Sequence, residues 1–252
     1  MDRLVFFYSD SECIDGYHDS HSLSRQTTER GTWKTLKDSR SLHVSHRNVF
    51  GKEYTKREMK ITSALVPSGP VLDIGCGKGI VTWMIPDHIQ YFGIDFNTDH
   101  LKNEWDGRDV EARICGNAIQ LPFINSSFRT ILLRHVIEHL PSILQMQLLK
   151  EAYRVLSNFG TLIISTPNLG TLVHAEKFLP PYDPTHFRCL TSGEVKVLLT
   201  GVGFRSIRRH AYDLVVEYPS SLVRLIPQST RRLLAKTFPP LDKHLIFTAT
   251  KS

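Results

Sequence analysis

The stretch Val71–Ile85 reads VLDIGCGKGIVTWMI and places three glycines within five residues, directly after an apolar run. An apolar run that closes on Asp73, between turn residues, predicts a short buried strand. Gly75, Gly77 and Gly79 then form a G-x-G-x-G turn, whose backbone can approach a ligand closely. We expect a helix to follow at 80–85, with free N–H groups at its start. The stretch therefore predicts a strand, a ligand-binding turn and a helix.

The next strand-like run, YFGID, ends in Asp95, twenty residues after Gly75. A carboxylate at that place can accept hydrogen bonds from both hydroxyls of a ribose. The glycine spacing is neither the G-x-G-x-x-G dinucleotide pattern nor the G-x-x-x-x-G-K-[ST] phosphate loop. The two features together favour a nucleoside-containing ligand of another kind over a plain tight turn beside a surface acid.

Strand-like and helix-like runs alternate along the chain. Apolar periodicity predicts strands at 71–74, 91–94, 111–115, 130–134, 160–165, 205–209 and 245–250. It predicts helices at 51–65, 80–85, 98–105, 142–156 and 192–201. Such alternation indicates an α/β fold in which helices cover both faces of a mainly parallel sheet.

The composition narrows the class of protein. The chain has 252 residues, 41% of them hydrophobic, which suits one substantial globular domain with additions. No apolar run approaches the length of a membrane helix, and the first residues lack a secretory signal, so we expect a cytoplasmic protein without an integral membrane segment. The four cysteines form no C-x-x-C pair, which argues against a disulfide framework or a cysteine zinc site.

Charge is unevenly distributed. The net charge is +6, and residues 201–252 carry nine basic and three acidic side chains, which accounts for the whole excess. This segment is either a solvated basic face or a contact for an anionic partner. Residues 1–50 have no clear apolar period, and we interpret them as an N-terminal arm or a lid.

Several motifs, taken in order, resemble those of class I S-adenosylmethionine-dependent methyltransferases of the type 11 and ubiquinone-biosynthesis-like kind. They are VLDIGCGKG, GIDFN, GNAIQLPF, SSFRTILLRHVIEHL and DPTHFRCLTSGEVKVLLTGVGF, with HLIFTATK resembling the final strand. The turn Asn158–Gly160 departs mildly from the Pro-Gly-Gly of many members. The resemblance implies a seven-stranded Rossmann-like sheet whose last strand is antiparallel. It also implies a methyltransferase domain over 51–252, with substrate-side insertions near 167–188 and 212–241.

The resemblance also implies that S-adenosyl-L-methionine is the cofactor and indicates the residues that hold it. They are Asp73, Gly75, Cys76 and Gly77 in the first motif, Asp95 and Phe96 in the second, Asn117 and Ala118 beside the adenine, and Arg134 at the end of the fourth strand.

The candidate catalytic residues cluster in RHVIEHLP, directly after the predicted fourth strand. His135 and His139 are four residues apart and Glu138 lies between them, while His186 in DPTHF follows later. Three roles remain open: a histidine acts as general base, the group binds a divalent metal, or Glu138 and His139 fix the loop. The metal alternative has a parallel in small-RNA 2′-O-methyltransferases, whose Glu-x-x-Glu-His pattern is similar. Our primary assignment is without a metal.

Two classes of molecule remain open as the acceptor of the methyl group. We expect O-methyl transfer to a small molecule such as a glycan, a quinone or a secondary metabolite. The alternative is an RNA 2′-O-methyltransferase, and nucleic acid is the less favoured partner. The insertion near 212–241 mixes apolar and basic residues, which suits a lid, a homodimer contact, a peripheral membrane contact or a phosphate-binding surface. We favour a lid or a homodimer contact, because helical apolar stripes are mostly buried.

Overall fold

The computed structural model describes residues 49–168, 185–211, 227–238, 242 and 244–252. Side chains are described for these residues except 49–55, 228, 232 and 235. The predicted N-terminal arm therefore lies almost wholly outside the described residues. So do most of the two predicted insertions, at 169–184, 212–226 and 239–241.

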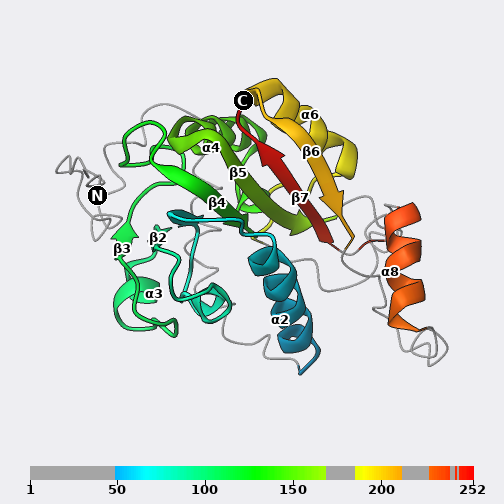
Figure 1. Ribbon diagram of the computed structural model, residues 1–252, viewed down its shortest axis with the longest axis horizontal. Coiled ribbons are helices and arrows are strands. Elements are labelled where there is room, and N and C mark those ends of the chain that lie inside the picture. Colours follow the sequence, from blue (N-terminus) through cyan, green and yellow to red (C-terminus); the bar gives the residue numbers. More distant parts are fainter. Residues whose placement is uncertain (1–48, 169–184, 212–226, 239–241, 243) are drawn as a thin grey trace.

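A seven-stranded sheet forms the centre of the molecule (Figure 1). Its strand order is β3-β2-β1-β4-β5-β7-β6. Strands β1 to β5 run parallel to one another, whereas β7 is antiparallel to both β5 and β6. This topology confirms the predicted Rossmann-like sheet with an antiparallel last strand. The strands are β1 Val71–Ile74, β2 Tyr91–Asp95, β3 Ala112–Cys115, β4 Phe128–Arg134, β5 Leu156–Pro167, β6 Arg205–His210 and β7 His244–Thr250.

The helices differ more from prediction than the strands do. The longer ones are α2 Val49–Ala64, α4 Ser142–Val155, α6 Ser192–Val202 and α8 Gln228–Thr237. The predicted helix at 80–85 is a five-residue 3-10 helix, η3 Ile80–Met84, and α3 is shortened to Thr98–Lys102. A second 3-10 turn, η4, covers Ile137–His139.

The helix expected after the glycine turn is short because a neighbouring segment is tied to it. The Thr82 hydroxyl donates to the carbonyl of Gly79 and accepts from the backbone N–H of Arg108. The Arg108 guanidinium donates to the carbonyl of Thr82. The helix that follows the glycine turn is therefore a short 3-10 helix and not the expected α-helix.

Two apolar clusters cover opposite faces of the sheet. Alternate residues of β4 separate between them: Ile131 and Leu133 belong to the larger cluster, and Leu132 belongs to the smaller one. Helices α4 and α6 pack on the larger cluster, while Met59 of α2 lies in the smaller one. Figure 1 shows α4 and α6 on one side of the sheet and α2 on the other. Both faces are covered, which explains why β1 and β2 are buried along their whole length rather than at alternate residues.

The carboxyl ends of the parallel strands bring several chemically active segments to one edge. The turn after β1, the end of β2 and the segment after β4 all lie there, and so does the start of β7, because β7 is antiparallel. Open α/β sheets bind their ligands at this edge.

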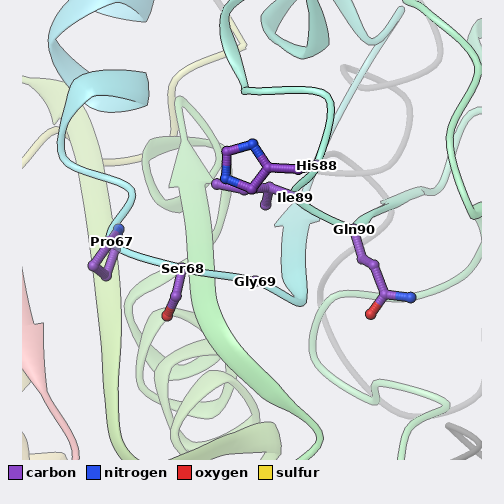
Figure 2. Close-up of a pocket in the computed structure, with 6 residues that line it drawn as sticks. All are labelled: Pro67, Ser68, Gly69, His88, Ile89 and Gln90. Carbon is purple, nitrogen blue, oxygen red and sulfur yellow. The ribbon is translucent and has the colours of Figure 1, made fainter. Parts of the chain in front are cut away.

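A cavity of about 220 Å³ lies at the other edge, before β1 and β2 (Figure 2). It is lined by Pro67, Ser68, Gly69, His88, Ile89 and Gln90. None of the residues predicted to carry function lines this cavity. Helices in the described ranges are too short or too polar to cross a lipid bilayer.

Candidate functional site

The three glycines of the turn all have positive φ, but they serve different ends. A Cβ at Gly75 would lie 2.3 Å from a methyl of Val136, and one at Gly79 would lie 2.2 Å from the ring of Trp105. A Cβ at Gly77 would meet no atom within 4 Å. The space beside Gly75 and Gly79 is therefore filled by protein side chains, and only Gly77 borders open space. The assignment of Gly75 and Gly77 as cofactor-binding residues stays a prediction, and the open space lies at Gly77.

Asp95 holds the glycine turn against the end of β2. Its Oδ2 accepts the backbone N–H of Gly77 and its Oδ1 accepts that of Asn97, both at 2.8 Å. The side chain is only 7% exposed. A carboxylate offers about four lone-pair positions, so these two backbone donors leave capacity for two hydroxyls of a ligand. Asp95 thus lies at the end of β2, as predicted, and is hydrogen-bonded directly to Gly77.

Asp73 is buried beneath the turn, where its Oδ2 accepts the Tyr91 hydroxyl. Its Oδ1 has no hydrogen-bond partner among the described residues. Burial raises the pKa of Asp73 to about 6, against the opposing effects of the Arg134 charge and the Tyr91 hydrogen bond. A buried carboxylate oxygen without a partner is costly, and it can be satisfied by a donor that a ligand brings.

The other residues predicted to bind the cofactor follow β1, β2 and β3 at the same edge of the sheet, but they differ in exposure. The Cys76 thiol is buried against Gly93 of β2, and burial raises its pKa, so it fills space and is no nucleophile. Phe96 follows β2 and is 63% exposed. Asn117 is exposed after β3, with its Oδ1 accepting the N–H of Ile119, and Ala118 packs against the core.

Arg134 differs from expectation, because its guanidinium is occupied within the protein. It forms a bidentate ion pair with Glu58 of α2, with Nη2 2.6 Å from Oε2. The Ser165 hydroxyl of β5 donates to the same carboxylate at 2.6 Å. Burial acts to raise the pKa of Glu58, but Arg134 outweighs it and holds this pKa below its ordinary value. The Arg134 side chain therefore anchors α2, and its assignment as a cofactor ligand gains no support from these contacts.

His135 follows β4 in a left-handed backbone conformation, with φ of 52°. Its backbone N–H donates to the carbonyl of Ser165, and its Nδ1 lies 3.1 Å from Oε1 of Glu138. Burial acts to lower the pKa of His135, but the hydrogen bond and charge of Glu138 outweigh burial and raise it. Because Nδ1 pairs with the carboxylate, Nε2 is the nitrogen left to act on a substrate.

Glu138 is fully buried in η4, between two partners. Oε1 pairs with His135, and Oε2 accepts the hydroxyl of Thr166 at 3.0 Å. Burial acts to raise the pKa of Glu138, but the paired His135 outweighs it and lowers the pKa. Glu138 is therefore held as a carboxylate beneath the histidine.

His139 turns away from His135 and faces the segment that carries His186. Its Nδ1 lies 3.1 Å from the carbonyl oxygen of Thr185, and its ring meets that of His186 edge to face at 4.9 Å between centroids. His135 precedes the 3-10 turn Ile137–His139 and does not belong to it, so His135 and His139 do not share a helical face. Glu138 lies between His135 and the other two histidines: it pairs with His135 Nδ1, and a carboxylate oxygen lies within 4.8 Å of a ring nitrogen of both His139 and His186.

Sequence reasoning missed three polar residues of the site. Glu58 is buried in α2, Thr166 bonds Glu138 and Thr185 bonds His139. Glu58 stands in the charged stretch KREMK, which is typical of an exposed helix face. The only signal in the sequence was that Glu58 directly precedes the apolar Met59, and this signal is too weak to predict a buried acid.

Comparison with known proteins now bears on this geometry. Residues 72–164 match the family described as "Methyltransferase domain". A "Probable S-adenosylmethionine-dependent methyltransferase" of Mycolicibacterium smegmatis is 32% identical over 138 residues, which is 53% of this chain and 51% of that protein. A demethylmenaquinone methyltransferase of Listeria welshimeri is 35% identical over 112 residues, 39% of this chain and 46% of that protein. This chain therefore spans about half the length of these curated relatives.

A solved structure extends the likeness beyond the central motifs. A SAM-dependent methyltransferase of Thermotoga maritima, a possible histamine N-methyltransferase, superposes with a TM-score of 0.63 at 19% identity. The superposition covers 88% of this chain and all of that one. At this level of identity the likeness establishes the fold, including the seven-stranded sheet, and does not extend to the substrate.

Proposed function

We propose that this chain, whose residues 72–164 lie in a methyltransferase domain of the class I S-adenosylmethionine-dependent type, transfers a methyl group to an oxygen of a small molecule. The observation that supports this most is that Gly77, which borders open space, is hydrogen-bonded to the Asp95 carboxylate. The histidines lie at the same edge of the sheet. The named demethylmenaquinone methyltransferase relatives favour a small acceptor. These relatives give no support to the RNA alternative.

The residues present fit S-adenosylmethionine. Open space at Gly77 lets the backbone lie against the ligand, and Asp95 keeps acceptor capacity for the ribose hydroxyls. The unpartnered Oδ1 of Asp73 can accept a donor from the amino acid portion. The exposed ring of Phe96 and the backbone near Asn117 and Ala118 are suited to contact the adenine.

The chemistry divides between cofactor and protein. When bound, S-adenosylmethionine supplies an electron-poor methyl group on its sulfonium sulfur. His135 would accept the proton of the acceptor hydroxyl at Nε2, while Glu138 holds the ring through Nδ1. His139 and His186 would lie on the acceptor side and position it. The products are the methyl ether, S-adenosylhomocysteine and one proton.

Binding of the product S-adenosylhomocysteine tests the cofactor site. We expect the wild-type chain to bind it in calorimetry, and Asp95→Ala to weaken binding by about 1–3 kcal/mol through lost hydrogen bonds to a charged group. Asp99→Ala, four residues further on and exposed, is the matched control and should leave affinity unchanged. Failure of the wild type to bind would refute the proposed function.

A methyl-transfer screen tests the catalytic assignment. Tritiated S-adenosylmethionine is incubated with cell extract, which is then fractionated into small molecules, lipids, protein and RNA. With the acceptor found, His135→Ala should lower kcat by about 10²–10⁴-fold, as expected for loss of a general base, at unchanged S-adenosylhomocysteine affinity. His88→Ala, at the opposite sheet edge, should match wild type. Equal turnover in His135→Ala would exclude it as the base, and label in RNA would overturn the small-molecule acceptor.

A further inference from the structure

We propose that Glu138, His139 and His186 bind a divalent transition-metal ion. One ligand atom from each side chain lies within 4.8 Å of the others, although His139 and His186 are 47 positions apart in the sequence. This inference deepens the proposed function and rests on it for its purpose, because the ion would lie among the residues assigned to the acceptor side. Its binding can nevertheless be measured without any methyl transfer.

The backbone holds the two segments together independently of the three side chains. The N–H of Arg188 donates to the backbone carbonyl of Glu138 at 3.1 Å. The side-chain amide of Gln145 donates to the carbonyls of both Ile137 and Arg188. The histidine of the second segment is therefore carried to η4 by main-chain contacts. Ligand atoms bound to one ion are about 3–3.5 Å apart. The three ligand atoms therefore have to approach one another by about 1–2 Å, which rotation of their side chains can supply.

His139 is oriented as a metal ligand needs to be. Its Nδ1 lies 3.1 Å from both the carbonyl oxygen and the hydroxyl oxygen of Thr185, and in the tautomer that donates to the carbonyl this nitrogen carries the proton. Nε2 then keeps a lone pair. Metal-binding histidines commonly donate the other ring N–H to a carbonyl in this way, which fixes both tautomer and ring orientation.

Glu138 is equally prepared. Its side chain is fully buried and has two hydrogen-bond partners, His135 on Oε1 and Thr166 on Oε2. About two of its four lone-pair positions stay available. Hydrogen bonds from behind are the usual support of a ligating carboxylate. His135 would then support the ligand through Nδ1 without being a ligand.

The donor set indicates which ion fits. Two imidazoles and one carboxylate suit Zn²⁺, Fe²⁺ or Co²⁺, whereas Mg²⁺ and Ca²⁺ prefer sites made of oxygen alone. Three protein ligands leave coordination positions open to water or to an oxygen of the acceptor. An acceptor with a hydroxyl that the ion can bind is therefore the chemical class that this site selects.

Cobalt binding to the full-length chain tests the proposal. After treatment with a chelator and its removal, the protein is titrated with Co²⁺ alone, and binding is followed by visible d–d absorption and by calorimetry. We expect His139→Ala and His186→Ala each to weaken the site by at least about tenfold, because even supporting residues of metal sites contribute that much. The exposed His88→Ala is the matched control and should retain the wild-type spectrum and affinity.

S-adenosylhomocysteine affinity, measured on the same preparations, separates the possible failures. Retained affinity in each variant shows that it is folded, so a loss of the cobalt spectrum then reports the metal site. Cofactor binding without cobalt binding in the wild type would overturn the metal inference alone. So would a cobalt spectrum that survives both His139→Ala and His186→Ala. Loss of cofactor binding in the wild type would instead refute the proposed function.

Discussion

His135 and Asp73 lie in conformations and surroundings that folding alone would not favour. The left-handed backbone of His135 costs about 1–2 kcal/mol for a residue with a Cβ. Asp73 is buried with one unpartnered carboxylate oxygen. Both residues lie at the carboxyl edge of the sheet, beside Gly77 and Asp95. Strain and unsatisfied polar groups gathered at one edge indicate that this edge is shaped for binding.

The raised pKa of Asp73 predicts a particular dependence of stability on pH. The folded state holds the proton up to about pH 6, whereas the unfolded carboxyl loses it near its ordinary pKa of 3.8. Asp73 therefore lowers the free energy of unfolding as pH rises through this window, by about 3 kcal/mol above pH 6, since each pH unit between the two values is worth about 1.4 kcal/mol. Asp73→Asn carries no such penalty.

Urea unfolding at about pH 4 and pH 7 measures this effect. The free energy of unfolding of Asp73→Asn, taken relative to that of wild type, should rise by about 2.4 kcal/mol from pH 4 to pH 7, because the unfolded carboxyl is already partly ionised at pH 4. Asp99→Asn, on the exposed start of α3, serves as the control and should track wild type. If the difference in free energy of unfolding between Asp73→Asn and wild type does not change with pH, then the pKa of Asp73 is not raised in the folded state.

At the scale of elements, α2 is the helix whose role is least apparent from its composition. Its buried Glu58 pairs with Arg134 of β4 and accepts from Ser165 of β5, so one carboxylate joins a helix to two central strands. Glu58 is 1% exposed and Arg134 13% exposed. Such a pair adds little net stability over apolar residues, but breaking it leaves one charge buried and uncompensated.

Removing one partner should therefore be costly. We expect Glu58→Ala to lower the free energy of unfolding by about 3–5 kcal/mol, because the Arg134 guanidinium would remain buried. Chemical denaturation measures the loss. Lys60→Ala, on the exposed face of the same helix, should change stability by no more than about 0.5 kcal/mol.

The double variant Glu58→Met/Arg134→Met separates charge from packing. Replacing both charges by apolar groups of similar length should recover most of the lost stability, since no uncompensated charge remains. If the double variant is as unstable as Glu58→Ala, the loss arises from packing of α2 and the ion-pair argument is contradicted.

At the scale of the whole molecule, strand direction explains why the site forms. Five parallel strands deliver their carboxyl ends to one edge, and the antiparallel β7 adds its first residues to the same edge. His244 at the start of β7 thus meets the ring of His135 at 5.2 Å between centroids, although 109 residues separate them. The cavity lined by His88 lies at the opposite edge and takes no part in this assembly (Figure 2).

Strand β1 was predictable because it is a short, mainly apolar run bounded by turn residues. Gly69 and Pro70 precede β1 and the glycine turn follows it, so the bounds Val71–Ile74 are marked on both sides. Helix type was less predictable. Whether residues 80–85 form an α-helix or a 3-10 turn depends on hydrogen bonds from Arg108, a residue more than twenty positions away. Periodicity within a short window carries no information about such contacts.

By itself, the sequence determined the order of strands and helices, the glycine turn and the acid that faces it, because these depend on local patterns of apolar residues and on backbone freedom. Only the tertiary structure decided that Gly77 is the glycine with open space and that Arg134 is bound by Glu58. It also decided that Glu138 lies between His135 and the other two histidines. These outcomes depend on which side chains from distant segments fill the same space, and on the cost of leaving a buried charge without a partner. Neither quantity is set until the sheet has formed.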